Sequence, residues 1–200
     1  MLVSEVKLKS LKRESGKTYL YLVRHAHFNI PKKGNDPHPP ISKKGRVQAR
    51  AVARKFIPLK NNVEVFYCSS MKRAIQTAGE IRKTIGKKPK HHDSLWEFNK
   101  ILWTNRYYHY KYWKHWRKHK LTISALNDIL KSHQGKVILI VAHGNVIKGI
   151  LRNKARVPAS TLRKLEYKHC HITFMKFDGT RLEKTYCINS KHPPLISLPF

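Results

Sequence analysis

The sequence predicts a three-layer α/β sandwich in which a mostly parallel sheet lies between two layers of helices. Two apolar, β-prone segments, 19–23 and 136–141, have the composition of strands that are buried on both faces. Segments with helical periodicity alternate with the strand segments, which is typical of parallel βαβ units. At 200 residues the chain is long enough for one domain with a full core.

The first half of the chain supplies alternating elements. We expect a strand over 19–23, a loop over 27–40, a helix from 42 to about 56, a strand over 63–67, a helix over 71–85 and a short strand near 91. Ser42 is a good N-cap, and Val47, Ala51 and Val52 are expected on the inner face of its helix. Gly86 is a normal stop signal for the second helix.

The second half is expected to complete the sheet. We predict helices over 107–118 and 123–133, a strand over 136–141, a helix over 145–152, a short helix after Pro158, and strands over 171–177 and 181–188. Asp178-Gly179 suits the turn of a hairpin between the last two strands. The predicted domain spans 18–188 and contains a basic, aromatic cap insert over 98–134, with tails over 1–17 and 189–200.

The two buried strands each end in a histidine. Arg24-His25-Ala26 follows the first strand, and Ala142-His143-Gly144 follows the second. Because the carboxyl ends of neighbouring parallel strands meet at one edge of an α/β sheet, we expect His25 and His143 to share one site.

Five motifs in order carry a resemblance to a known family. They are Arg24-His25-Ala26, Ile41-Ser42-Lys43-Lys44-Gly45-Arg46-Val47-Gln48-Ala49, Ser69-Ser70-Met71-Lys72-Arg73-Ala74-Ile75-Gln76-Thr77-Ala78, Leu95-Trp96-Glu97 and Ala142-His143-Gly144-Asn145-Val146-Ile147. Together they resemble the histidine phosphatase (phosphoglycerate-mutase-like) superfamily over about 18–186. The third and fifth strings are most similar to the mitochondrial phosphoglycerate-mutase-like protein phosphatase branch.

The resemblance implies a metal-independent phosphomonoesterase that acts through a phosphohistidine. It assigns catalytic roles to His25 (nucleophile), Glu97 (general acid) and His143, and phosphate binding to Arg24, Arg73, His143, Gly144 and Asn29. A neutral imidazole can attack phosphorus, and the planar fork of arginine can bind two phosphate oxygens. The implied substrate is a phosphorylated molecule, with protein phosphoserine or phosphothreonine as one class.

Each of these residues also has a plainer interpretation. Arg73 could be a solvated residue on a helix face, His143 a core histidine, and Glu97 a surface carboxylate. Two features favour chemistry: Arg73 stands at a helix start, where backbone donors favour phosphate, and Trp96 and Phe98 flank Glu97 in a way that would raise its pKa.

The chain departs from the family pattern near the first motif. Ala26 replaces the usual glycine, and His27 stands where many members carry glutamate. Pro31 holds the position of an expected asparagine, so Asn29 is the nearest amide. These changes weaken any transfer of phosphoglycerate-mutase substrate specificity but leave the residues for phosphoryl transfer complete.

The charge of the chain is extreme for a soluble enzyme. Forty-two Lys and Arg against eleven Asp and Glu give a formal net charge of +31. Such self-repulsion favours a polyanionic partner, which could be nucleic acid, an anionic membrane surface or a polyphosphorylated ligand, and we expect RNA in a larger assembly first. The alternative function is therefore an RNA-bound structural subunit of a ribonucleoprotein, such as an organellar ribosome, built on a phosphatase-like fold whose activity is vestigial.

The cap insert has the composition of a nucleic-acid-binding surface, with no acid between Phe98 and Asn127. Its candidate binding residues combine cations for phosphates with aromatic rings for stacking: Lys111, Lys114, Arg117, Lys118, Trp113 and Trp116. The alternative is a cap helix whose aromatic residues pack on the domain.

No cofactor or metal is expected. His115 and His119 lie four residues apart, as metal ligands on a helix can, but a solvated basic helix explains them better. The cysteines Cys68, Cys170 and Cys187 show no C-x-x-C spacing, which favours a reducing, intracellular compartment, mitochondrial or cytoplasmic. No apolar run is long enough to cross a bilayer.

Overall fold

The computed structural model of the chain describes residues 13–29, 38–98, 110–165 and 167–188. Its elements, in order, are β1 (Lys17–Arg24), α1 (Lys43–Lys55), the 3-10 helix η1 (Ile57–Leu59), β2 (Val63–Cys68), α2 (Lys72–Ile85), β3 (Lys90–His91), the 3-10 helix η2 (Asp93–Leu95), α3 (Tyr110–Ser132), β4 (Val137–Ala142), α4 (Gly144–Lys154), α5 (Ala159–Lys164), β5 (Ile172–Asp178) and β6 (Arg181–Ile188).

The described strands form one six-stranded sheet in the order β3-β2-β4-β1-β5-β6. β1, β2, β3 and β4 run parallel, whereas β5 is antiparallel to β1 and β6 is antiparallel to β5. The predicted three-layer α/β sandwich with a mostly parallel sheet is therefore confirmed. The two strands that end in histidine are direct neighbours, and their register pairs Arg24 with Ala142.

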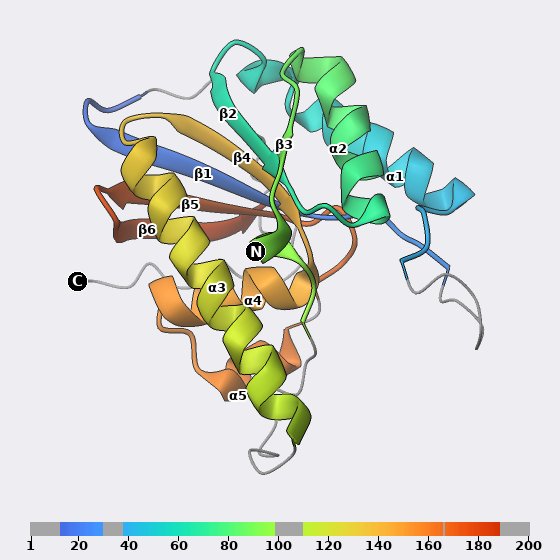
Figure 1. The fold of residues 1–200 in the computed structure, drawn as a ribbon. Coiled ribbons are helices and arrows are strands. Elements are labelled where there is room, and N and C mark those ends of the chain that lie inside the picture. Colours follow the sequence, from blue (N-terminus) through green and yellow to red (C-terminus); the bar gives the residue numbers. More distant parts are fainter. Residues whose placement is uncertain (1–12, 30–37, 99–109, 166, 189–200) are drawn as a thin grey trace, which may run out of the picture.

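A hydrophobic core fills each side of the sheet, and the helices divide between the two sides (Figure 1). Alternate residues of β1 point to opposite sides, as the period of a strand requires. Tyr19 and Tyr21 pack with α1 and α2, while Leu20 and Leu22 pack with α3 and α4. Both cores thus anchor β1, and the residues that follow it are held at a rigid edge.

The predicted boundaries of the first two helices are confirmed, but the prediction that Val47 lies on the inner face is wrong. Ser42 caps α1 by accepting a hydrogen bond from the Gly45 amide at 3.0 Å, and Gly86 ends α2 with a φ of +74°. Val47 points outward and is 66% exposed, because the inner stripe of α1 is built from small residues. A Cβ at Gly45 would lie 2.0 Å from the His27 carbonyl oxygen, so this helix packs closely on the loop after β1.

The two helices predicted on either side of residue 120 are one continuous helix, α3. The sequence over 118–123 contains neither Gly nor Pro, so nothing interrupts the backbone hydrogen bonding there. Leu126, Ile129 and Leu130 in its second half belong to the sheet's core. Residues 99–109 of the expected cap insert lie outside the described residues, as do 1–12 of the N-terminal tail and all of the C-terminal tail.

None of the described helices has the length and apolar character needed to cross a bilayer.

Candidate active site

His25 and His143 meet at the carboxyl edge of the sheet, as the sequence predicts. Each follows the last residue of its strand, β1 or β4, and their ring centroids are 5.0 Å apart. The His25 backbone amide donates to the Ala142 carbonyl at 2.9 Å, which continues the strand pairing into the site. Both histidines are buried, with 1% and 0% of their surface exposed.

The hydrogen bonds of His25 define its tautomer. Nδ1 lies 2.8 Å from the Ala26 carbonyl oxygen, which can only accept, so Nδ1 carries the proton. Nε2 then holds the lone pair, and the Nε–H of Arg73 donates to it at 3.2 Å. Burial lowers the pKa of His25 well below its usual value, and the charges of Arg73 and Arg24 lower it further. The result is a neutral imidazole with a nucleophilic nitrogen beside two guanidinium groups.

Arg73 is buried at the beginning of α2, so its interpretation as a solvated residue on a helix face is wrong. Its guanidinium carbon lies 4.8 Å from the centre of the Phe28 ring. Arg24 projects from the end of β1, and its Nη1 donates to the Tyr167 carbonyl. Burial lowers the pKa of both arginines, which nevertheless stay protonated at neutral pH. Two fixed positive charges at a helix N-terminus make a site for an anion.

Glu97 comes directly after η2 and Trp96, and the beginning of α4 holds its carboxylate. Oε1 accepts the backbone N–H of Asn145 at 3.1 Å, and the Asn145 side chain donates to the Phe98 carbonyl at 2.8 Å. Burial raises the pKa of Glu97 to about 7, although Arg73 and Arg24 oppose the rise. The side chain is only 25% exposed, which contradicts its interpretation as a surface carboxylate. At neutral pH this carboxyl group can either give or take a proton.

His143 contacts both the acid and a serine that the sequence analysis missed. Its Nδ1 lies 3.8 Å from Glu97 Oε2, and its Nε2 lies 2.8 Å from the hydroxyl oxygen of Ser69. Ser69 is fully buried directly after β2, and its amide donates to the Val141 carbonyl. Burial, followed by the charges around it, lowers the pKa of His143 well below its usual value. The sequence offered one signal for this contact, which is that Ser69 closely follows a third predicted strand.

Gly144 and Asn29 are the last two residues predicted to bind phosphate, and only Gly144 lies beside the other groups of the site. Gly144 begins α4, and a Cβ there would be in ordinary contact with the Arg24 side chain, 3.4 Å from its Nε. The room beside Gly144 is therefore used by Arg24 itself. Asn29 is exposed beyond Phe28, and its role in binding phosphate stays a prediction.

Three side chains of the site could in principle hold a metal ion. One ligand atom from each of His25, Glu97 and His143 lies within 4.8 Å of the others. However, Arg73 already donates to the nitrogen that His25 would offer, and Arg24 adds a second positive charge. The positive charges of these two arginines repel a metal cation and attract an anion, so the site fits a phosphoryl group better than a metal ion.

The residues predicted to bind nucleic acid lie on α3, where some are exposed and others pack against the domain. Trp113, Lys114 and Arg117 are exposed on α3, with Trp113 62% exposed. Trp116 packs against the core, and Lys118 Nζ lies 5.9 Å from the centre of the Trp96 ring. The side chain of Lys111 lies outside the described part of the chain.

The expected solvated face around His115 and His119 is only partly observed. His115 is half-buried, but His119 is 5% exposed, so its interpretation as a solvated residue is wrong. Its ring lies 5.7 Å from the ring of Phe98 and 5.5 Å from that of Trp116. His119 therefore fastens α3 to the segment that follows Glu97.

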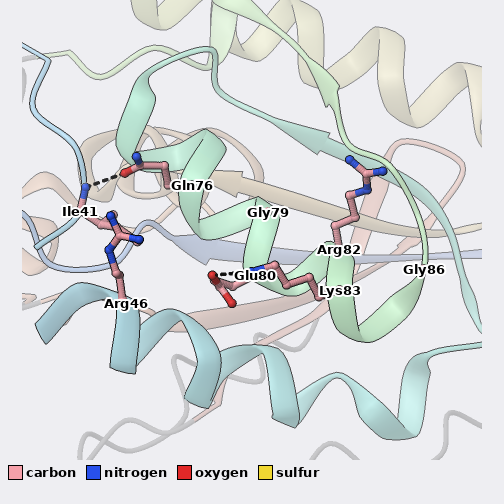
Figure 2. Close-up of a pocket in the computed structure, with 8 residues that line it drawn as sticks. All are labelled: Ile41, Arg46, Gln76, Gly79, Glu80, Arg82, Lys83 and Gly86. Atoms are coloured by element: carbon pink, nitrogen blue, oxygen red, sulfur yellow. Dashed lines mark hydrogen bonds and ion pairs between the residues drawn. The ribbon is translucent and has the colours of Figure 1, made fainter. Parts of the chain in front are cut away.

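A separate hollow of about 470 Å³ lies between α1 and α2 (Figure 2). Arg46, Arg82 and Lys83 contribute positive charge to its lining, and Glu80 pairs with Lys83 at 2.9 Å. None of its lining residues belongs to the cluster around the two histidines. We therefore place the candidate active site at the histidines and not in this hollow.

Comparison with known proteins agrees with the geometry of the site. Residues 20–189 match the family model described as "Histidine phosphatase superfamily (branch 1)". The chain belongs to this superfamily.

Relatives of this histidine phosphatase cover most of its length. The curated protein "Putative phosphoserine phosphatase 2" of Hydrogenobacter thermophilus is 28% identical over 192 residues, which cover 84% of this chain and 93% of the relative. A mutant phosphoserine phosphatase from Entamoeba histolytica, solved in complex with phosphoserine, has a TM-score of 0.64 at 22% identity and covers 87% of this chain and 98% of its own. Phosphoglycerate mutase from Bacillus anthracis has a TM-score of 0.67 at 16% identity, with coverages of 84% and 91%. The two structures show that the fold is shared.

Proposed function

We propose that this histidine phosphatase hydrolyses phosphomonoesters through a phosphohistidine on His25, without a metal. The observation that carries the proposal is the arrangement around His25 Nε2: a lone pair fixed by the Nδ1 contact, with Arg73 at 3.2 Å. Membership of a phosphatase superfamily supports the reaction class.

In the first step, Nε2 of His25 forms a bond to phosphorus while the bond between phosphorus and the ester oxygen breaks. Protonated Glu97 gives its proton to the departing oxygen, which leaves as an alcohol. In the second step, a water molecule attacks phosphorus and gives a proton to the Glu97 carboxylate. The P–N bond then breaks, which releases phosphate and restores neutral His25.

Charge stabilisation falls to the groups around His25. The Arg24 guanidinium is held by a hydrogen bond to the Tyr167 carbonyl before the substrate arrives, so it needs little reorganisation when charge spreads over the phosphoryl oxygens. The Nε–H of Arg73 turns from His25 Nε2 to a phosphoryl oxygen as the substrate enters, which frees the lone pair for attack. His143, oriented by Ser69, is close enough to Glu97 and His25 to bind the same oxygens.

For the substrate, we propose esters of phosphate with an aliphatic hydroxyl, of which phosphoserine, free or within a protein, is the first class to test. A curated relative and a solved neighbour named for phosphoserine support this order. Phosphothreonine peptides and 3-phosphoglycerate complete the test panel. We expect 3-phosphoglycerate to be a poor substrate, because the departures at Ala26 and His27 argue against the specificity of a phosphoglycerate mutase.

The test is hydrolysis of p-nitrophenyl phosphate in EDTA by the wild type, His25→Ala and the control His91→Ala. His91 is exposed in β3 and stands outside the site. We expect EDTA-resistant activity that His25→Ala abolishes and His91→Ala leaves unchanged. Activity that survives His25→Ala, or that requires a divalent metal, contradicts the proposal.

A second candidate function is attachment to RNA within a larger particle through the exposed face of α3. The observations that favour it are the net charge of +31 and the exposed Trp113 beside exposed Lys114 and Arg117. Each contact between a cation and a phosphate releases counterions from the RNA, and should therefore contribute about −0.7 to the log–log slope of affinity against salt for single-stranded RNA. The ring of Trp113 offers a surface on which a base can stack.

This candidate is tested with two variants that each remove two charges. Lys114→Gln with Arg117→Gln should flatten the salt slope for a single-stranded RNA, whereas Arg46→Gln with Arg54→Gln, on α1, should have little effect. α1 and α3 cover opposite faces of the sheet (Figure 1). No binding at low salt, or equal losses from both variants, contradicts a docking surface on α3.

A further inference from the structure

His169 is a partly buried histidine that the proposed reaction does not use. It lies on the segment between α5 and β5, about 140 residues after the first motif. Its ring centroid lies 5.5 Å from that of His25 and 5.3 Å from that of His27, so it forms one wall of the same site. The sequence analysis did not select it, because no strand end or helix start marks it.

The backbone next to His169 is strained. Cys170 has a φ of +59°, a left-handed conformation that costs free energy for any residue with a Cβ. Two hydrogen bonds hold the turn against the end of β1: the Cys170 amide donates to the Arg24 carbonyl at 3.0 Å, and the Arg24 amide donates to the His171 carbonyl at 3.0 Å. Within the turn, the His171 amide donates to the Lys168 carbonyl at 3.2 Å. This turn fixes where the side chain of His169 can lie.

The contact that results is with Arg24. Nη2 of Arg24 lies 3.4 Å from Nε2 of His169, while Nη1 donates to the Tyr167 carbonyl. Since a guanidinium group can only donate, Nε2 of His169 must accept, and its proton must be on Nδ1. Both terminal nitrogens of Arg24 are thus held by one short segment, 167–169.

The third nitrogen of Arg24 differs from the two terminal nitrogens. Its Nε is buried and has no hydrogen bond to the described residues, and it lies beside Gly144, the neighbour of His143 in sequence. A buried donor of this kind needs an acceptor, and a phosphoryl oxygen in the site would supply one.

We propose that His169 is a positioning residue, which holds the Arg24 guanidinium so that its Nε–H is presented to the phosphoryl group. The inference rests on the proposed phosphatase function. His169 acts through Arg24 and contributes only as a neutral ring that accepts a hydrogen bond.

The groups that face His169 keep the ring neutral. Burial lowers its pKa to about 4, and the charges of Arg24 on β1, His27 after β1, Lys44 on α1 and Arg73 on α2 act in the same direction. Below that pH the ring gains a proton on Nε2 and can no longer accept from Arg24. Loss of this acceptor in acid is a property that a merely space-filling residue would not have.

The test compares His169→Gln, which keeps an acceptor of similar reach, with His169→Leu, which does not. At pH 6, kcat/KM for p-nitrophenyl phosphate should be close to wild type in His169→Gln and reduced in His169→Leu, by up to about 10²-fold, the size of effect that misplaced groups produce. Between pH 6 and 4 the wild type should lose more activity than His169→Gln, because Gln does not titrate.

Binding of inorganic phosphate, followed by calorimetry with the same three proteins, separates this proposal from the phosphatase itself. If the wild type binds phosphate but hydrolyses nothing, the proposed function fails, while weaker binding in His169→Leu than in His169→Gln still supports the positioning role. If His169→Leu does not fold, the comparison of wild type with His169→Gln across pH 4–6 decides. Equal activity and phosphate affinity in all folded variants, or an acid loss unchanged by His169→Gln, overturns the proposal.

Discussion

Replacing Glu97 by Gln should stabilise the protein in alkaline solution. Burial raises the pKa of this carboxyl group from 4.5 to about 7, so above pH 7 the folded chain carries a charge that its surroundings disfavour. Each pKa unit corresponds to about 1.4 kcal/mol, so ionisation of Glu97 is about 3 kcal/mol costlier in the folded chain than in the unfolded chain. Gln has nearly the same shape and can keep the Asn145 contact, but it does not ionise.

The direction in which the free energy of unfolding changes with pH follows from the number of protons that the folded and unfolded states bind. Between pH 4.5 and 7 the folded chain holds a proton on Glu97 that the unfolded chain has lost, so this group makes the free energy of unfolding fall as the pH rises. We therefore expect Glu97→Gln to match the wild type near pH 4.5 and to exceed it by up to about 3 kcal/mol at pH 8.

Urea denaturation at pH 4.5 and pH 8 provides the measurement, with Glu80→Gln as the control. Glu80 lies in ion pairs with Lys83 and Arg50 on the α1–α2 face, away from the site, and because these two cations are 70% and 63% exposed, such pairs contribute at most about 1 kcal/mol. If Glu97→Gln is equally or less stable than the wild type at pH 8, the carboxylate is not held at a cost and its raised pKa is refuted.

Three further predictions concern activity. Glu97→Gln should lower kcat/KM, which reports the first step, by about 10²–10⁴-fold for alkyl phosphates and far less for p-nitrophenyl phosphate, because only a poor leaving group needs the proton; equal losses of kcat/KM for both would remove Glu97 from the acid role. For alkyl phosphates, the wild-type kcat should fall above an apparent pKa near 7, where Glu97 loses its proton, and this limb of a pH–rate profile should be absent in Glu97→Gln. Ser69→Ala should lower kcat while the protein stays folded, since it removes the hydroxyl that lies 2.8 Å from His143 Nε2; unchanged kcat, with folding checked by circular dichroism, would show that Ser69 does not orient this ring.

Those parts of the fold that depend on periodicity and stop signals could be predicted from the sequence. The buried strands before His25 and His143 are continuous apolar runs, and Ser42 and Gly86 are strong local signals. Val47 shows where such signals fail. Hydrophobicity placed it inside, but the close approach of α1 to the His27 carbonyl required Gly45 on the inner face instead.

The residues of the site could be predicted where a motif names them, whereas the contacts of Ser69 and His169 could not. Arg24, Arg73 and Glu97 were named from motifs, and the structure brings them to one edge of the sheet with the two histidines. His169 was missed because its place depends on a strained turn at Cys170 and on hydrogen bonds to β1. Such long-range backbone contacts leave no local pattern in a sequence.

The measurement that tests the mechanism most directly is the capture of the covalent intermediate. Glu97→Gln removes the base for the second step, so with p-nitrophenyl phosphate in EDTA a phosphorylated enzyme should accumulate. Rapid quenching in alkali, followed by peptide mapping with mass spectrometry, should place the phosphoryl group on the imidazole of His25. A phosphoryl group on Ser69 or His143, or turnover with no covalent intermediate, would contradict the assignment of His25 as the nucleophile.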